Sequence, residues 1–149
     1  MRTPPARSIP LTLALGLILA GGVALAQQKA TDPAVIARQN DMDTIAANMK
    51  ILGEMASGKA AFDAAKAGTA AQTLAAAADN VPTVFKSDAT EPASKASPKI
   101  WTDWEGFLRH AEDLRKGAHA IDASSLDSLK ATLGGAGGTC RSCHSEFRT

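Results

Sequence analysis

The chain has 149 residues, and its 16 lysines and arginines nearly balance its 15 aspartates and glutamates. This balance gives no argument for nucleic acid or an anionic membrane, so we expect no nucleic-acid partner. Aromatic residues are only 4% and alanine is abundant, which favours a core of helices packed closely on small side chains. No acid–base pair or nucleophile constellation stands out, so we expect no enzymatic activity.

Residues 1–26 have the features of a secretory signal peptide. Arg2 and Arg7 form a basic start, residues 11–25 are apolar, and an Ala-x-Ala cleavage pattern ends the segment. The apolar run is shorter than the ~18 residues that a spanning helix needs, and an uncleaved anchor is the alternative. We expect export to the periplasm of a Gram-negative bacterium, a mature domain over residues 27–149, and no stable membrane anchor after cleavage.

The first predicted helix begins at Asp32 and Pro33, a capping residue followed by a proline at the first helical position, and Gly58 marks its end. One face recurs at spacings of three and four residues: Val35, Arg38, Met42, Ile45, Met49, Leu52 and Ala56. Arg38 does not belong in a simple core, because a buried arginine needs an anionic partner. Either its head reaches past the end of the core to water, or an anion lies beside it.

A second helix is predicted from its cap, Asp63, to about Asp79, with Pro82 ending it. One side of this helix is rich in alanine: Ala67, Ala71, Leu74, Ala78 and Val81. Residues 86–97 are rich in Ser, Pro and charged residues and have no periodicity. We expect them to form a surface loop between the second and third helices.

The third helix is predicted from Pro98 to about Asp122, after Ser97 as its cap. Its apolar face contains Trp101, Trp104, Leu108, Ala111, Leu114, Ala118 and Ile121. His110 and His119 flank this face, and we interpret them as surface or edge histidines rather than as ligands.

The last helix is capped by Ser124 or Ser125, and Asp127 is consistent with a start that resembles a capping box. Its face contains Leu126, Leu129, Leu133, Gly137, Cys140, His144 and Phe147. Four glycines within residues 134–138 are poor helix formers. We expect a flat group to lie against the backbone there; the alternative is a break, with the following residues on a separate short helix.

Residues 140–144 read Cys-Arg-Ser-Cys-His, the C-x-x-C-H attachment sequence of a c-type haem. Two thiols on one helical turn can each add to one vinyl group, and His144 then offers an imidazole nitrogen to the iron. Cys140 and Cys143 are the only cysteines in the chain. We therefore predict one haem c, bound covalently through Cys140 and Cys143, with His144 as a metal ligand.

Other uses of this motif are less favoured. A thioredoxin-like C-x-x-C should lie near a βαβ pattern, and no convincing strand is found. A structural zinc site normally takes four Cys or His ligands, whereas the motif offers three. A disulfide between the two cysteines would suit an oxidising compartment, but it leaves His144 unexplained.

Four amphipathic helices with mostly short connections predict an all-α fold, an antiparallel four-helix bundle. Because the motif lies close to the end of the last helix, we expect the haem inside the bundle near one end. In this arrangement a haem propionate is the anion that would pair with Arg38.

Four stretches of the mature chain also match a known pattern: residues 38–42 (RQNDM), 58–63 (GKAAFD), 97–101 (SPKIW) and 139–148 (TCRSCHSEFR). With them, the chain resembles the class II c-type cytochromes, the cytochrome c′ and cytochrome c556 family, over residues 33–148. A C-terminal C-x-x-C-H is itself discriminating, because class I cytochromes c carry theirs near the N-terminus.

The resemblance implies a left-handed four-helix bundle in the periplasm, often dimeric, so a homodimer and periplasmic redox partner proteins are expected. It implies that Cys140 and Cys143 are thioether anchors and that His144 is the proximal ligand. It also places Arg38 near a propionate. Arg148 matches a family position on the proximal side, with a solvated C-terminal arginine as the alternative.

The expected function depends on Met42, which the resemblance places on the distal side of the haem. In the c556 type a methionine here is the sixth ligand of a low-spin iron, which suits electron transfer, and we expect this role. In cytochrome c′ the iron is usually five-coordinate and binds nitric oxide or carbon monoxide. Met42 would then pack as a core residue without reaching the iron.

Overall fold

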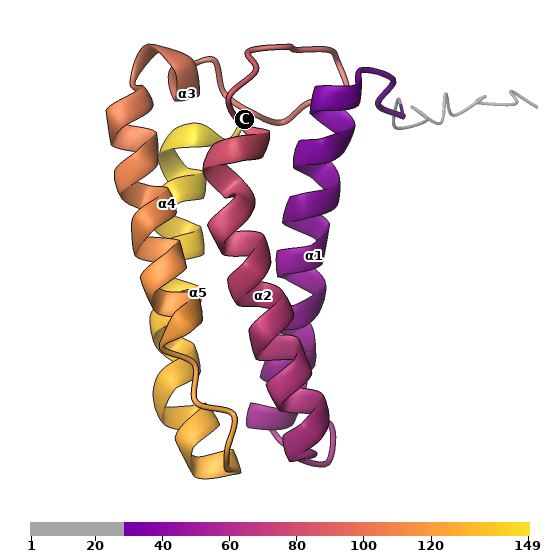
Figure 1. Cartoon of the computed structure of the whole chain (residues 1–149), viewed down its shortest axis with the longest axis vertical. Coiled ribbons are helices and arrows are strands. Elements are labelled where there is room, and N and C mark those ends of the chain that lie inside the picture. Colours follow the sequence, from indigo (N-terminus) through magenta and orange to yellow (C-terminus); the bar gives the residue numbers. More distant parts are fainter. Residues whose placement is uncertain (1–28) are drawn as a thin grey trace, which may run out of the picture.

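The computed structural model describes residues 29–149, and the expected signal peptide, residues 1–26, lies outside this part of the chain. The described residues contain the helices α1 (Pro33–Ala56), α2 (Ala64–Val84), α3 (Lys99–Thr102), α4 (Trp104–His119) and α5 (Leu126–Phe147). The four long helices form an antiparallel bundle, and α3 is a single turn ahead of α4 (Figure 1). The prediction of an all-α bundle is therefore confirmed for the described residues.

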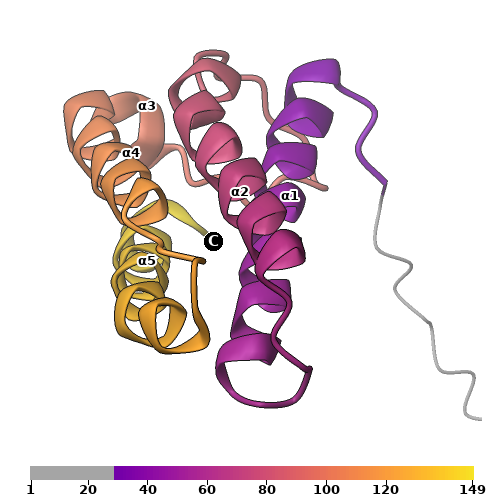
Figure 2. The ribbon, with the colours of Figure 1, turned by 60° about the horizontal axis from the view of Figure 1, so that its bottom comes forward.

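The helices pack in a ring. α1 packs on α2, α2 on α4, α4 on α5, and α5 returns to contact α1. Figure 2 shows the α1–α2 pair and the α4–α5 pair as two halves of the bundle. The crossover, which we define as residues 85–98, joins these halves at the end of the bundle where the C-terminus lies (Figure 1). The first and last helices are thus neighbours in space although they are far apart in sequence.

Short polar side chains start α1, α2 and α5 as predicted, whereas the N-cap of α3 is Pro98 and not Ser97. The carboxylate of Asp32 accepts a hydrogen bond from the Ala34 amide at 2.8 Å, and that of Asp63 accepts one from Lys66 at 3.0 Å. Ser125, rather than Ser124, caps α5. These contacts satisfy amide groups that have no partner inside the first helical turn.

Two predicted boundaries were wrong. Pro82 lies inside α2 instead of ending it. Proline removes only its own amide donor, so the amides that follow it can still donate hydrogen bonds within the helix. The amide of Phe85 still donates to the Val81 carbonyl at 3.2 Å. The third helix, expected to be continuous from Pro98 to Asp122, is interrupted at Asp103, whose carboxylate accepts from the Gly106 amide at 3.0 Å and so starts α4 afresh.

Two buried clusters fill the bundle. The alanine-rich cluster comprises Leu52, Met55, Ala67, Ala70, Ala71, Leu74, Ala75, Ala78, Ala118 and Leu129. The aromatic cluster comprises Ile45, Ala77, Val81, Phe85, Ile100, Phe107, Ala111 and Phe147. The alanine side predicted for α2 is buried as expected. The interruption at Asp103 separates α3, in which Ile100 is buried and Trp101 half-buried, from α4, whose first residue, Trp104, is also half-buried.

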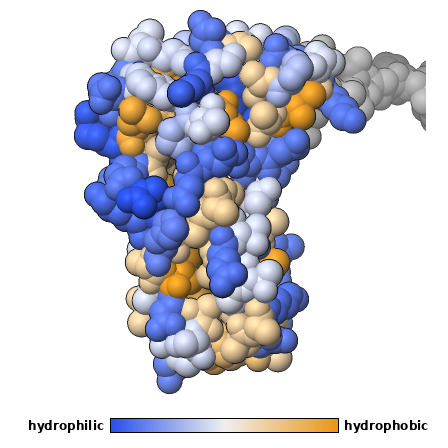
Figure 3. Space-filling model, viewed as in Figure 1, coloured by the Kyte–Doolittle hydropathy of each residue, from blue (hydrophilic) through white to orange (hydrophobic). Residues whose placement is uncertain are grey.

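The outer surface is mixed in character. On the face shown in Figure 3, hydrophobic residues are interspersed with hydrophilic ones. Within residues 29–149, Ile36 is the exposed large hydrophobic residue. Within these residues, no helix combines the length and the apolar character that crossing a membrane requires.

The glycines of the bundle serve different purposes. Gly58 has a φ of 76°, a left-handed conformation that turns the chain from α1 to α2. At Gly117 a Cβ atom would lie 3.0 Å from the Cα of Ala136, so the backbones of α4 and α5 approach closely here. Residues 134–138 continue α5 without interruption, so the alternative of a helix break is wrong.

Gly117→Ala should destabilise the holoprotein by about 1 kcal/mol. Overpacking costs ~1–3 kcal/mol, which exceeds the ~0.5–1 kcal/mol that alanine gains over glycine within a helix. Gly68→Ala on α2 is the control, because its Cβ would meet nothing within 4 Å, and it should be neutral or stabilising. Denaturant titrations measure both free energies of unfolding; equal stabilisation by the two substitutions would contradict a tight contact at Gly117.

Candidate haem-binding site

The two cysteines lie one turn apart near the end of α5, half-buried and with free thiols. The thiol of Cys140 donates to the Ala136 carbonyl at 3.4 Å. Cys143 packs against the aromatic cluster. Its burial, together with Cys140 and the charge of Glu146, raises the pKa of the Cys143 thiol to about 11. The motif is therefore on a regular helix with its second thiol turned toward the core.

His144 and Arg148 lie one turn apart at the C-terminal end of α5, and both are exposed. Partial burial lowers the pKa of His144, and the positive charge of Arg148 lowers it further. Both effects favour the neutral imidazole, which is the form that binds a metal. The structure thus places Arg148 close enough to His144 to act on its charge.

Met42 lies in the first half of α1 and is half-buried against the aromatic cluster. Cys143 packs against the same cluster, so the fold brings Met42 and the motif to one part of the core. The preceding residue ties α1 to α2, because the Asp41 carboxylate accepts a hydrogen bond from Asn80 at 3.1 Å. Desolvation by burial raises the pKa of Asp41. Sequence reasoning had not identified this link.

Arg38 is buried, with only 3% of its surface exposed. The alternative in which its head reaches past the core to water is therefore wrong. Its Nε donates to the Ala34 carbonyl at 3.2 Å, and its Nη2 donates to the carbonyl of Ala89 in the crossover. Its guanidinium carbon lies 5.2 Å from the ring centroid of Trp101 and 5.7 Å from that of Phe85.

Arg38 nevertheless has an unused donor. Its Nη1 is buried and has no hydrogen-bond partner among the described residues. Burial lowers the pKa of Arg38, and the charge of Asp32 offsets part of this effect. A buried cation with a free donor calls for an anionic acceptor, since an unsatisfied buried group costs ~1–3 kcal/mol.

The residues present fit a covalently attached haem. The two thiols have the required spacing, and the carboxylates of a haem would supply the acceptor that Nη1 of Arg38 needs. A Cβ atom built at Gly134, Gly135 or Gly138 would meet nothing within 4 Å, because these three glycines are exposed, whereas one at Gly137 would meet Met49 at 3.9 Å.

The remaining histidines lie at the edges of the bundle. His119 is exposed, and its Nε2 lies 3.0 Å from an Asp79 oxygen on α2. His110 is half-buried between α4 and α5. Its Nε2 lies 3.4 Å from Glu146, and its Nδ1 lies 3.4 Å from the Ser142 hydroxyl. Both positions agree with the interpretation as edge residues.

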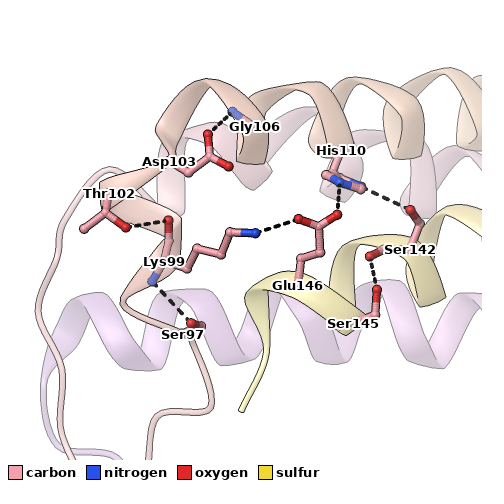
Figure 4. A network of polar contacts seen from close by, with 9 residues as sticks. All are labelled: Ser97, Lys99, Thr102, Asp103, Gly106, His110, Ser142, Ser145 and Glu146. Atoms are coloured by element: carbon pink, nitrogen blue, oxygen red, sulfur yellow. Dashed lines mark hydrogen bonds and ion pairs between the residues drawn. The ribbon is translucent and has the colours of Figure 1, made fainter.

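Glu146 is the centre of a polar network that joins three helices (Figure 4). Its carboxylate accepts a hydrogen bond from the Lys99 ammonium on α3 at 2.7 Å and faces His110 on α4. The Lys99 ammonium also lies 5.1 Å from the ring centroid of Phe147. Periodicity could not reveal this network, because Lys99 and His110 both lie more than thirty positions before Glu146 and belong to other helices.

The sequence matches the family described as Cytochrome C′ over residues 33–148. The chain belongs to this family. It is 35% identical to a cytochrome c′ of Rhodopseudomonas palustris over 92% of this chain and 93% of the relative. It is 28% identical to a cytochrome c-556 of the same organism, with 89% and 91% covered.

Among solved structures, the nitric oxide complex of a cytochrome c′ mutant from Alcaligenes xylosoxidans is similar, with a TM-score of 0.70 and 25% identity. The match covers 78% of this chain and 94% of that one. The resemblance drawn from the four sequence stretches is thereby confirmed.

As a member of the cytochrome c′ family, the chain carries one haem c, bound covalently through Cys140 and Cys143. The bound haem supplies an iron that can change oxidation state or bind a diatomic gas. The groups that lie on the two sides of the iron determine whether a change of oxidation state or gas binding is favoured.

Glu146→Gln should lower the melting temperature of the holoprotein at pH 7, with a difference that shrinks below about pH 4. The hydrogen bond from Lys99 and the charge of Lys99 lower the pKa of Glu146, and His110 adds to this. The stabilisation is therefore present above the unfolded pKa and is lost as pH falls through the folded one. Thermal unfolding followed from pH 3 to pH 7 measures this.

Two further variants test the assignment to the network. Glu54→Gln is the control, because Glu54 pairs only within α1, with Lys50 at 3.8 Å, and should show a smaller pH-dependent difference. In a Lys99→Met background the effect of Glu146→Gln should be reduced. An undiminished effect in that background would show that the Lys99–Glu146 contact is not its source.

Proposed function

We propose that this protein is a periplasmic electron carrier whose haem iron is ligated by His144 and Met42. The observation that carries this proposal is that Met42 of α1 and Cys143 of α5 pack against the same aromatic cluster. A haem attached at Cys143 would therefore have a thioether within the same part of the core. Thioether ligation favours ferrous iron and raises the reduction potential.

Two strong axial ligands also suit electron transfer, because the iron keeps nearly the same geometry in both oxidation states. In this proposal His144 is the proximal ligand, and its lowered pKa supports the neutral form needed for coordination. Arg38 pairs with a haem propionate through its free Nη1. Arg148 lies on the proximal side and influences His144 through its charge.

The proposed location follows from the first residues of the chain. Residues 1–26 would direct export and then be removed, which leaves the bundle in the periplasm. Its redox partners would be proteins of that compartment. A homodimer of the bundle is compatible with this role.

A second candidate is a five-coordinate cytochrome c′ that binds nitric oxide or carbon monoxide at the distal face. The nitric oxide complex of the similar Alcaligenes xylosoxidans protein supports it. In this case Met42 would pack beside the haem without reaching the iron, as half-buried methionines do in many cores.

Met42→Leu decides between the two candidates, because leucine keeps the volume and removes the sulfur. Under the first, the oxidised wild-type protein shows a methionine-to-iron charge-transfer band, and the variant loses it, becomes high-spin, binds carbon monoxide and has a lower reduction potential. Visible spectra and redox titration of the purified holoproteins measure these changes.

Met49→Leu is the matched control. Met49 lies on the same face of α1 two turns later and is also half-buried, so its substitution should keep the band. A wild-type protein that is already high-spin and binds carbon monoxide readily would contradict the electron-carrier proposal and favour the gas-binding one.

A further inference from the structure

The Arg38 guanidinium is held on several sides by groups from three parts of the chain. Its own helix provides the Ala34 carbonyl, and the crossover provides the Ala89 carbonyl. The rings of Trp101 and Phe85 lie 5.2 and 5.7 Å from the guanidinium carbon. These distances are within the range of a cation–π interaction. The head of Arg38 therefore has a defined orientation before any anion is considered.

Only one end of this cation remains without a partner. Nη1 is buried and unbonded, and no carboxylate within residues 29–149 forms an ion pair with Arg38. The groups in direct contact with the guanidinium are neutral carbonyls and aromatic rings, and the charge of Asp32 offsets only part of the effect of burial on the pKa of Arg38. The positive charge of Arg38 is thus available to an anion on the side of Nη1.

Trp101 is itself fixed. Its indole nitrogen donates to the Phe85 carbonyl at 2.9 Å, which ties α3 to the beginning of the crossover. Trp101 also lines a surface hollow of about 290 Å³ together with Lys86 and Trp104. Its ring therefore stands between the buried guanidinium and a hollow that opens to solvent. Trp104 lines the same hollow but stacks on Phe107, with 5.4 Å between ring centroids.

We propose that Trp101 is a positioning residue, which holds Arg38 so that Nη1 points at a haem carboxylate and which keeps this ion pair from solvent. The proposal rests on the pairing of Arg38 with a haem propionate in the proposed function. Without the ring, the guanidinium gains freedom and contact with water through the hollow. Arg38 then neutralises less of the negative charge of the haem carboxylate.

This has a consequence for the iron. A negative charge near the haem stabilises the ferric over the ferrous form, so loosening Arg38 lowers the reduction potential. An exposed pair is also screened by salt more than a buried one. The reduction potential of the wild-type protein should therefore depend weakly on ionic strength, and that of a protein without the Trp101 ring should depend on it more strongly.

The experiment uses the holoproteins of Trp101→Leu, Arg38→Gln and the control Trp104→Leu, which removes an indole from the same hollow. We measure reduction potential against ionic strength, together with the visible spectrum and the melting temperature. Trp101→Leu should lower the potential and steepen its salt dependence in the same direction as Arg38→Gln. Trp104→Leu should leave the reduction potential and its salt dependence at the wild-type values. Trp101→Phe keeps a ring over Arg38, so its reduction potential should be closer to the wild-type value than that of Trp101→Leu.

The outcomes separate this proposal from the function on which it rests. If Arg38→Gln shifts the potential and Trp101→Leu does not, the positioning role is overturned while the pairing of Arg38 stands. If neither variant shifts it, the pairing itself fails. An equal shift in Trp104→Leu, or a changed iron spectrum in Trp101→Leu, would show a general structural effect and overturn the proposal. Should Trp101→Leu not fold, Trp101→Met, which fills the space without a ring face, takes its place.

Discussion

The packing of α1 and α5 on the aromatic cluster is the contact on which the site depends. Met42 comes from the third turn of α1, and Cys143 comes from the last turns of α5. Phe107 joins them to the rest of the core, because its ring lies 5.0 Å from that of Phe85 and 5.6 Å from that of Phe147. Met42 and the attachment motif are therefore brought together by one set of buried rings.

The crossover supports this site from outside the bundle. Its carbonyls at Ala89 and Ala93 accept hydrogen bonds from Arg38 and Gln39 of α1. At its other end, the Ser97 amide donates to the Phe147 carbonyl at 2.9 Å, where α5 finishes. A segment whose composition predicts only a surface loop thus links the helix that carries Met42 to the helix that carries the cysteines. Its role comes from backbone groups, which composition does not reveal.

The sequence predicted the features that depend on neighbouring residues. Helix starts at Asp32 and Asp63, the alanine face of α2 and the attachment motif all follow from local spacing or local hydrogen bonds. Pro82 and Asp103 were misjudged because a proline near a helix end costs one hydrogen bond, whereas an aspartate can start a new helix wherever its carboxylate reaches an amide. Helix propensity alone does not show which of the two, the proline or the aspartate, interrupts a helix.

The burial of Arg38 and the Glu146 network needed the tertiary structure. Helical spacing allowed two environments for the Arg38 guanidinium, water or an anion. Which of them applies depends on whether the crossover covers the guanidinium. The same holds for Glu146, whose partners Lys99 and His110 come from other helices. Long-range electrostatic contacts of this kind leave no periodic trace in a sequence.

The division of the core into two clusters has a further consequence. The alanine-rich cluster closes its end of the bundle with small side chains, so that α4 and α5 meet almost backbone to backbone at Gly117 and Ala136. The aromatic cluster fills its end of the bundle with large buried rings. Met42 and Cys143 pack against the aromatic cluster and not against the alanine-rich one. Since substitutions at distant, independent sites have additive effects on stability, a change at Met42 should leave the packing of the alanine-rich cluster unaltered.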